Sequence, residues 1–267
     1  MAKKQTYYYH QDKLDDFGTV GHNEKPLKDN YKYIHKNIFW RIASFILFYF
    51  IAFPILYIIS KICLGVKVKN KKQFRKKLKK GEGFFIYSNH CHYFDAFLYH
   101  LFVGFPNRTY VLSHADPTNI PIVKTLIALL GCFPLPNNVK NYKNFSKAMK
   151  YVLNKGSAIS IYPEGTLWPY YNGLRPMPKA CFKYAAINAK PIVLVAETWR
   201  KPKFFKFLKP RLTLTISDLI RIDENKNIEQ NTDFLYEKSL LFFEENVLKD
   251  DNISYHKYLP IETKENS

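Results

Sequence analysis

Two short polar segments of the sequence carry residues suited to acid–base chemistry. In the first, residues 88–95 (SNHCHYFD), His90 and Asp95 are five positions apart. On an ideal helix this spacing separates two side chains by about 140°, so the pair can meet only if the chain turns before a helix begins. In such a turn Asp95 would accept a hydrogen bond from one imidazole nitrogen, and the other nitrogen could take a proton from a substrate hydroxyl.

The second segment is residues 162–166 (YPEGT), which by itself is an ordinary turn sequence. Each polar segment directly follows a short apolar run, residues 84–87 and 158–161, that reads as a buried strand. Open α/β sheets place their sites at the carboxyl ends of strands. The two segments are therefore expected to converge on one cleft. For the first segment alone, a loop histidine beside an aspartate that caps a helix is the alternative.

The elements that would position these residues alternate between short apolar runs and longer mixed segments. Strands are predicted at residues 84–87, 109–112, 158–161, 192–195 and 211–216, the last half-exposed, and helices at 96–103, 121–130, 141–154, 179–188 and 235–248. This alternation predicts an α/β fold in which a mixed sheet is flanked by helices.

A long apolar segment, residues 42–60, precedes this domain and contains no charged residue. As a helix it would be about 28 Å long, just enough to cross the apolar core of a bilayer. Three interpretations are open: a transmembrane helix, a re-entrant or interfacial helical hairpin broken at Pro54, and a buried helix of a soluble core. The fold class therefore includes an N-terminal membrane-anchoring helix or helical hairpin.

Basic residues are concentrated immediately after this apolar segment. Residues 61–80 contain ten Lys and Arg and no acidic residue, within a chain whose net charge is +19. Such a run suits the anionic cytoplasmic surface of a membrane, although a solvated helix face has the same composition. The four cysteines are widely spaced and form no CxxC pair, which indicates a reducing compartment.

At this point the sequence resembles the glycerolipid acyltransferase family, whose best-known members acylate 1-acyl-glycerol-3-phosphate. Residues 89–95 match the family's first motif, NHxxxxD, and residues 162–166 match its third, FPEGT, with Tyr162 in place of Phe. Lys179 resembles a lysine that follows the third motif, and residues 190–193 (KPIV) resemble the fourth motif. The resemblance covers roughly residues 66–216.

The resemblance implies that His90 is the general base, that Asp95 orients it, and that an acceptor hydroxyl attacks an acyl thioester directly. Glu164, Gly165, Thr166 and Lys179 would bind the acceptor. No metal or bound cofactor is implied, and acyl-CoA or acyl-carrier protein would be the co-substrate. The partners would be an anionic membrane surface and a lysophospholipid, with the active site on the cytoplasmic face and no nucleic acid.

Four segments follow from the resemblance and the composition. We expect a poorly ordered tail at residues 1–30 that could lie on the main body, a membrane-associated segment at 31–65, the acyltransferase domain at 66–250 and a C-terminal tail at 251–267.

Two departures from the family pattern concern the acceptor. An arginine usually follows the second motif, residues 131–136 (GCFPLP), where this chain has Asn137, and the arginine expected after Thr166 is Leu167. Both arginines are associated with the acceptor phosphate, for which a planar guanidinium is well suited. Arg175, Lys179 or Arg200 could take over this role, or the acceptor could be another lysophospholipid or a glycolipid.

Other functions stay open. His90, His92 and Asp95 resemble the start of the HxHxDH motif of binuclear metal hydrolases, but the aspartate is one position late and the last histidine is absent. Cys91 could be a thiol nucleophile. The basic run and the many aromatic residues would suit a nucleic-acid-binding protein, but the apolar segment argues against it. A catalytically inactive lipid-binding relative is the remaining alternative.

Overall fold

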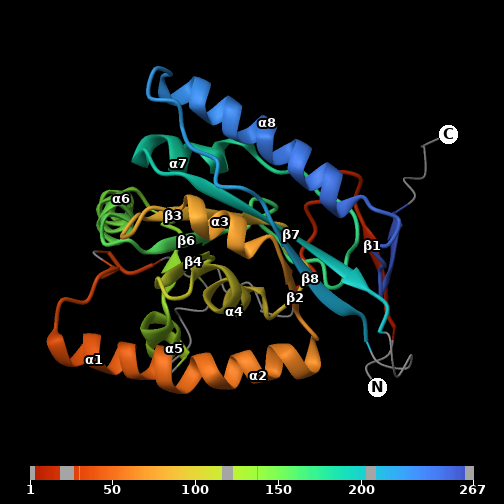
Figure 1. The fold of residues 1–267 in the computed structure, drawn as a ribbon, viewed down its shortest axis with the longest axis horizontal. Coiled ribbons are helices and arrows are strands. Elements are labelled where there is room, and N and C mark those ends of the chain that lie inside the picture. Colours follow the sequence, from red (N-terminus) through yellow and green to blue (C-terminus); the bar gives the residue numbers. More distant parts are fainter. Residues whose placement is uncertain are drawn as a thin grey trace.

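A mixed β-sheet forms the centre of the protein (Figure 1). The computed structural model describes residues 4–18, 27–29, 31–115, 123–136, 138–202 and 209–261. Within these ranges seven strands pair side by side, in the order β2 (Lys67–Lys69), β8 (Arg211–Ile216), β7 (Ile192–Arg200), β3 (Phe84–Ser88), β6 (Ala158–Ile161), β4 (Thr109–Ser113) and β5 (Cys132–Pro134). All neighbours are parallel except β7 and β8.

Helices cover both faces of the sheet (Figure 1). The described α-helices are α1 (Ile38–Ile46), α2 (Phe53–Cys63), α3 (Lys71–Lys77), α4 (Asp95–Tyr99), α5 (Val123–Leu130), α6 (Val139–Asn154), α7 (Lys183–Asn188) and α8 (Ile228–Val247). Alternate side chains of a strand point to opposite faces. Accordingly Ile86 packs in the cluster that contains residues of α3 and α4, whereas Tyr87 packs in the cluster with residues of α6, α7 and α8.

The structure confirms the predicted α/β fold with a mixed sheet and changes several details. The helix predicted at 96–103 begins at Asp95 and continues as a π-helix, His100–Gly104, and the one predicted at 179–188 begins as a 3₁₀ turn, Lys179–Phe182. The strand predicted at 211–216 is confirmed as β8, but its predicted half-exposure is wrong, because β8 lies between β2 and β7 and most of its residues are buried. Residues 121–122 of the helix predicted at 121–130 lie outside the described residues.

The two ends of the chain pair with each other beside the sheet. Strand β1 (Thr6–Tyr9) is parallel to β9 (Lys257–Pro260). The indole ring of Trp168 stacks on Tyr258, with ring centroids 5.1 Å apart, and also contacts Tyr9 and Phe17. The prediction of a poorly ordered tail is therefore wrong for residues 6–9, which form a strand because a partner from the far end of the chain completes their hydrogen bonds.

The apolar segment forms a single helix, Ile38–Cys63, along the bottom of the molecule in Figure 1. Its middle, Leu47–Ala52, is π-helical and ends two residues before Pro54. A π-turn widens the helix where the proline ring would collide with the preceding turn, so the helix continues and the hairpin alternative is wrong. By length and composition this helix could cross a membrane.

One side of this helix packs on the domain along most of its length. The Ser44 hydroxyl donates to the carbonyl of Leu129, Phe48 is buried against His100, and Ser60 is buried near the other end. The opposite side exposes a row of large apolar residues: Phe39, Ile42, Phe45, Ile46, Phe50, Ile51, Ile55, Ile58, Ile59 and Ile62. The helix is not a buried core helix, since only 11% of its most apolar window is buried. Contiguous apolar surface of this size marks an interaction site.

Replacing Phe39, Phe50 and Ile62 with Ser should weaken binding of the protein to phospholipid vesicles. A fully buried large apolar side chain contributes about 1.5–3 kcal/mol, so we expect the partition coefficient in vesicle flotation to fall at least ~100-fold. The matched control replaces Val139, Ile228 and Leu248, which are exposed elsewhere, and should float like the wild type. Equal flotation of all three proteins would exclude this helix face as the attachment surface.

Candidate active site

The loop after β3 brings His90 and Asp95 together. The imidazole Nδ1 of His90 lies 2.9 Å from Asp95 Oδ2. The same carboxylate oxygen accepts the backbone N–H groups of Cys91, at 3.0 Å, and of His92, at 2.9 Å. The chain therefore turns around Asp95 before α4 begins, and three N–H donors hold its carboxylate in one orientation. This arrangement directs Nε2 of His90 away from the carboxylate.

His90 lines a cavity of about 520 Å³. Its ring stacks on Tyr162, with centroids 4.2 Å apart, and its side chain is 22% exposed, whereas that of Asp95 is fully buried. The cavity is largely apolar, and its lining includes Tyr93, Ala96, Leu112, Ile161, Leu167, Cys181 and Tyr184. Among the described lining residues there is no Lys or Arg. This composition suits an acyl chain or another apolar group next to a histidine.

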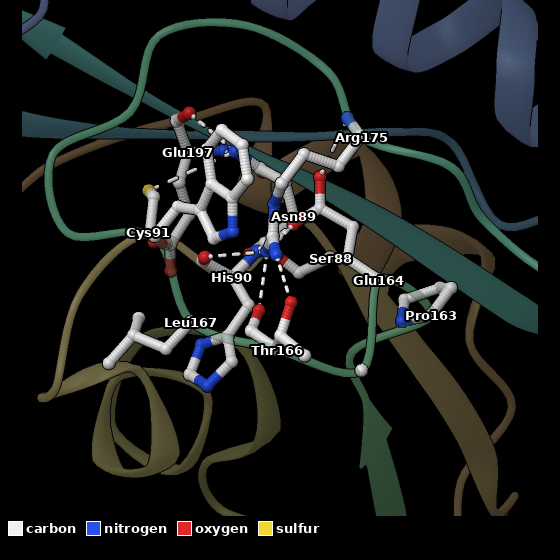
Figure 2. A network of polar contacts seen from close by, with 12 residues as sticks. Ser88, Asn89, His90, Cys91, Pro163, Glu164, Thr166, Leu167, Arg175 and Glu197 are labelled. Atoms are coloured by element: carbon white, nitrogen blue, oxygen red, sulfur yellow. Dashed lines mark hydrogen bonds and ion pairs between the residues drawn. The ribbon is translucent and has the colours of Figure 1, made fainter. Parts of the chain in front are cut away.

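A buried ion pair connects the two polar segments (Figure 2). Arg175 is paired with Glu164, and both side chains are almost fully buried. The guanidinium also donates to the carbonyl oxygens of His90 and Thr166 and to the Thr166 hydroxyl. Glu164 Oε2 in turn accepts the backbone N–H of His90 at 2.9 Å. The loop after β6 is thereby fixed against the loop that bears His90.

The predicted acceptor-binding residues fall in different places. Glu164 and Gly165 line the cavity, and Gly165 has φ +75°, a left-handed conformation that glycine adopts without strain. Thr166 lies beside them, with its hydroxyl bonded to Arg175. Lys179 is placed differently from its prediction, because its ammonium lies 2.6 Å from Asp233 and 3.4 Å from Glu229 of α8 and does not line the cavity.

The residues suggested as replacements for the missing arginines also make hydrogen bonds or ion pairs with other groups of the protein. Arg175 holds Glu164, and Arg200 donates to the carbonyls of Leu212 and Gly65. Leu167 is buried, lines the cavity, and donates its backbone N–H to Asp16. Asn137 lies outside the described residues.

Sequence reasoning missed one buried acid next to this site, Glu197 of β7. Its side chain is fully buried and accepts a hydrogen bond from the Tyr99 hydroxyl at 2.5 Å. It also accepts one from the Cys91 thiol at 3.1 Å (Figure 2). A carboxyl in an otherwise apolar strand was the available signal, because acids are almost never fully buried without a partner.

The described residues do not form the metal pattern of the rival family. His92 Nδ1 accepts the backbone N–H of Phe94, and Asp95 Oδ2 accepts three N–H donors. The described side chains that lie close enough to share an ion are Cys91, Asp95 and Glu197, and they include neither histidine of that pattern. Burial raises the pKa of the Cys91 thiol well above its ordinary value. A thiol with a raised pKa is a poor nucleophile.

A larger groove of about 790 Å³ lies elsewhere, between α1 and α6. Its described lining includes His35, Arg41, Arg108 and Lys155 but no carboxylate that could orient a histidine. The smaller cavity beside His90 is therefore the candidate active site.

Comparison with known proteins agrees with this geometry. Residues 65–196 match the sequence model of the Acyltransferase family, and this range includes both polar segments. No curated protein sequence matches the chain. Among solved structures, the 1-acyl-sn-glycerophosphate (LPA) acyltransferase PlsC from Thermotoga maritima has the same fold, with a TM-score of 0.52 and 19% identity over 79% of this chain and 89% of that one. The match makes residues 65–196 a domain of the Acyltransferase family, and the shared fold agrees with that assignment.

Proposed function

We propose that this acyltransferase moves an acyl chain from an acyl thioester to a hydroxyl of a lysophospholipid, with His90 as the general base. The observation that carries the proposal is the hydrogen bond of 2.9 Å between Asp95 and His90, which lines a largely apolar cavity. A base oriented by a buried carboxylate is the arrangement that activates a hydroxyl nucleophile.

The reaction needs no covalent acyl-enzyme. Nε2 of His90 takes the proton of the acceptor hydroxyl while its oxygen attacks the thioester carbon. The C–S bond then breaks, and the imidazolium returns the proton to the departing thiolate. Asp95 stabilises the positive charge that His90 carries in between.

The donor and the location are part of the same proposal. Acyl-CoA and acyl-carrier protein are soluble cytoplasmic thioesters, and the four cysteines are free thiols, which agrees with a site on the cytoplasmic face. The helix Ile38–Cys63 packs on the domain from Ser44 to Ser60. If this helix crossed the bilayer, the domain surface packed against it would also have to enter the lipid. We therefore propose that the helix lies in one leaflet, with its exposed apolar side facing the acyl chains of the lipid.

For the acceptor, 1-acyl-glycerol-3-phosphate is the first candidate, because the structurally similar PlsC is an acyltransferase of that class. A second candidate, a lysolipid without a phosphomonoester, is favoured by the cavity lining. Leu167 stands where the family has an arginine, and no described lining residue is Lys or Arg. Among these described residues, a phosphomonoester dianion would find no Lys or Arg of the kind that usually binds it.

His90→Ala should lower kcat by about 10²- to 10⁴-fold, the usual contribution of a general base. The measurement is thiol release from acyl-CoA by detergent-purified protein in the presence of a lysophospholipid. His35→Ala, in the distant groove, is the control and should keep the wild-type rate. An unchanged rate in His90→Ala would contradict the mechanism.

Leu167→Arg should raise kcat/KM for 1-acyl-glycerol-3-phosphate relative to a lysophosphatidylglycerol. A hydrogen bond to a charged group contributes about 1.5–3 kcal/mol, so we expect the preference to change by about tenfold or more. Leu167→Met keeps the apolar lining and should leave the preference unchanged. If the wild type already prefers the phosphomonoester and the arginine changes nothing, a different group binds the phosphate.

A further inference from the structure

Two carboxyl groups are buried together under the candidate base. Asp95 and Glu197 are both fully buried, and a carboxylate oxygen of each lies within 4.8 Å of the other and of the Cys91 sulfur. The two residues come from different elements, α4 and β7, which pack at the carboxyl end of β3. Two carboxylates this close in a buried site cannot both be ionised, so one of them holds a proton.

The hydrogen bonds indicate which carboxyl is ionised. Asp95 Oδ2 accepts three N–H donors, from His90 and from the backbone of Cys91 and His92. Such donors stabilise the charged form of a carboxylate. Glu197 accepts only a phenol and a thiol, from Tyr99 and Cys91. The negative charge therefore belongs on Asp95 and the proton on Glu197.

The other carboxylate oxygen of Asp95, Oδ1, lacks a hydrogen-bond donor. It is buried and has no hydrogen-bond partner among the described residues. An unsatisfied buried acceptor costs about 1–3 kcal/mol, and a protonated Glu197 is a neighbouring group that can donate to it. Burial, followed by the charge of Asp95 and a hydrogen bond to it, raises the pKa of Glu197 well above its ordinary value.

We propose that Glu197 is protonated and donates a hydrogen bond to Asp95 Oδ1, which makes it a positioning residue for the pair formed by His90 and Asp95. Its effect on catalysis rests on the function proposed above. The donated bond occupies Asp95 Oδ1 and holds the carboxylate in the orientation in which Oδ2 faces His90.

The backbone holds Glu197 in the register that this role requires. The amide of Asn89 donates to the Glu197 carbonyl at 3.0 Å and accepts the Glu197 N–H at 2.8 Å. Asn89 directly precedes His90, so β7 and the loop with the base move as one unit. The titratable groups around the Glu197 carboxyl are Asp95 and Tyr99 of α4, Cys91 of the loop and Tyr162 beyond β6.

Infrared difference spectroscopy tests the proton directly. The spectrum of the wild type minus that of Glu197→Gln at pH 8 should contain the C=O stretching band of a protonated carboxyl. Carboxyl groups with an ordinary pKa near 4 are ionised at this pH and do not give the band. Glutamine has the same shape and cannot give this band. Absence of the band would overturn the proposal, whatever the activity of the protein.

Kinetics test the positioning role. Glu197→Gln keeps a donor for Asp95 and should retain a kcat close to that of the wild type. Glu197→Leu removes the donor and should lower kcat by about 10- to 100-fold, as expected from an unsatisfied buried acceptor, with little change in KM. Without the donor Asp95 attracts the imidazolium more strongly, so the acid limb of kcat/KM should move to higher pH by about one unit.

The outcomes separate this inference from the proposed function. A purely structural Glu197 would lower the melting temperature of both variants without moving the pH limb in Glu197→Leu or restoring kcat in Glu197→Gln. That result would overturn the positioning role. If the wild type transfers no acyl chain to any acceptor, the proposed function fails, and the infrared band still decides whether Glu197 holds the proton.

Discussion

The guanidinium of Arg175 is buried between the two loops of the site, and the arrangement of both loops depends on it. A buried charge is tolerated only when it is paired and its donors are used. Glu164 supplies the opposite charge, and the carbonyl oxygens of His90 and Thr166 accept from the guanidinium. Removal of either partner would leave an uncompensated charge next to the base. The ion pair thus makes one rigid site from two separate strand ends.

The sheet explains why those strand ends meet. Strands β3 and β6 are parallel neighbours, so their carboxyl ends lie at the same edge, and each is followed by one of the polar loops. On the other side of β3 is β7, which brings Glu197 next to Cys91 and Asp95. The catalytic candidates come from local segments, whereas the groups that hold them come from neighbouring strands.

Two parts of the molecule outside the sheet surround the domain that carries the site: the paired terminal strands and the apolar helix. On one side, the terminal strands β1 and β9 pack their aromatic rings around Trp168, directly after Leu167. Along the base of the molecule, the helix Ile38–Cys63 presents its apolar side outward. An apolar cavity in a protein with an apolar outer face fits a substrate that partitions into lipid.

Much of this protein was determined by short-range patterns. The apolar runs before the loops predicted β3 and β6. The long uncharged segment predicted a helix but left its placement open among three interpretations. If His90 and Asp95 were to meet, their spacing required a turn, which the structure contains. These features depend on residues a few positions apart, so hydrophobic periodicity and turn chemistry are sufficient to predict them.

Only the tertiary structure decided which distant groups complete the site. Arg175 is 85 positions from the carbonyl of His90, and Glu197 is 106 positions from the thiol of Cys91. The order of strands places these residues, and no local pattern encodes that order. The same reason explains why Lys179 pairs with α8 and why β8 is buried between two strands. Burial of a polar group is stable only with a partner, and the fold chooses that partner.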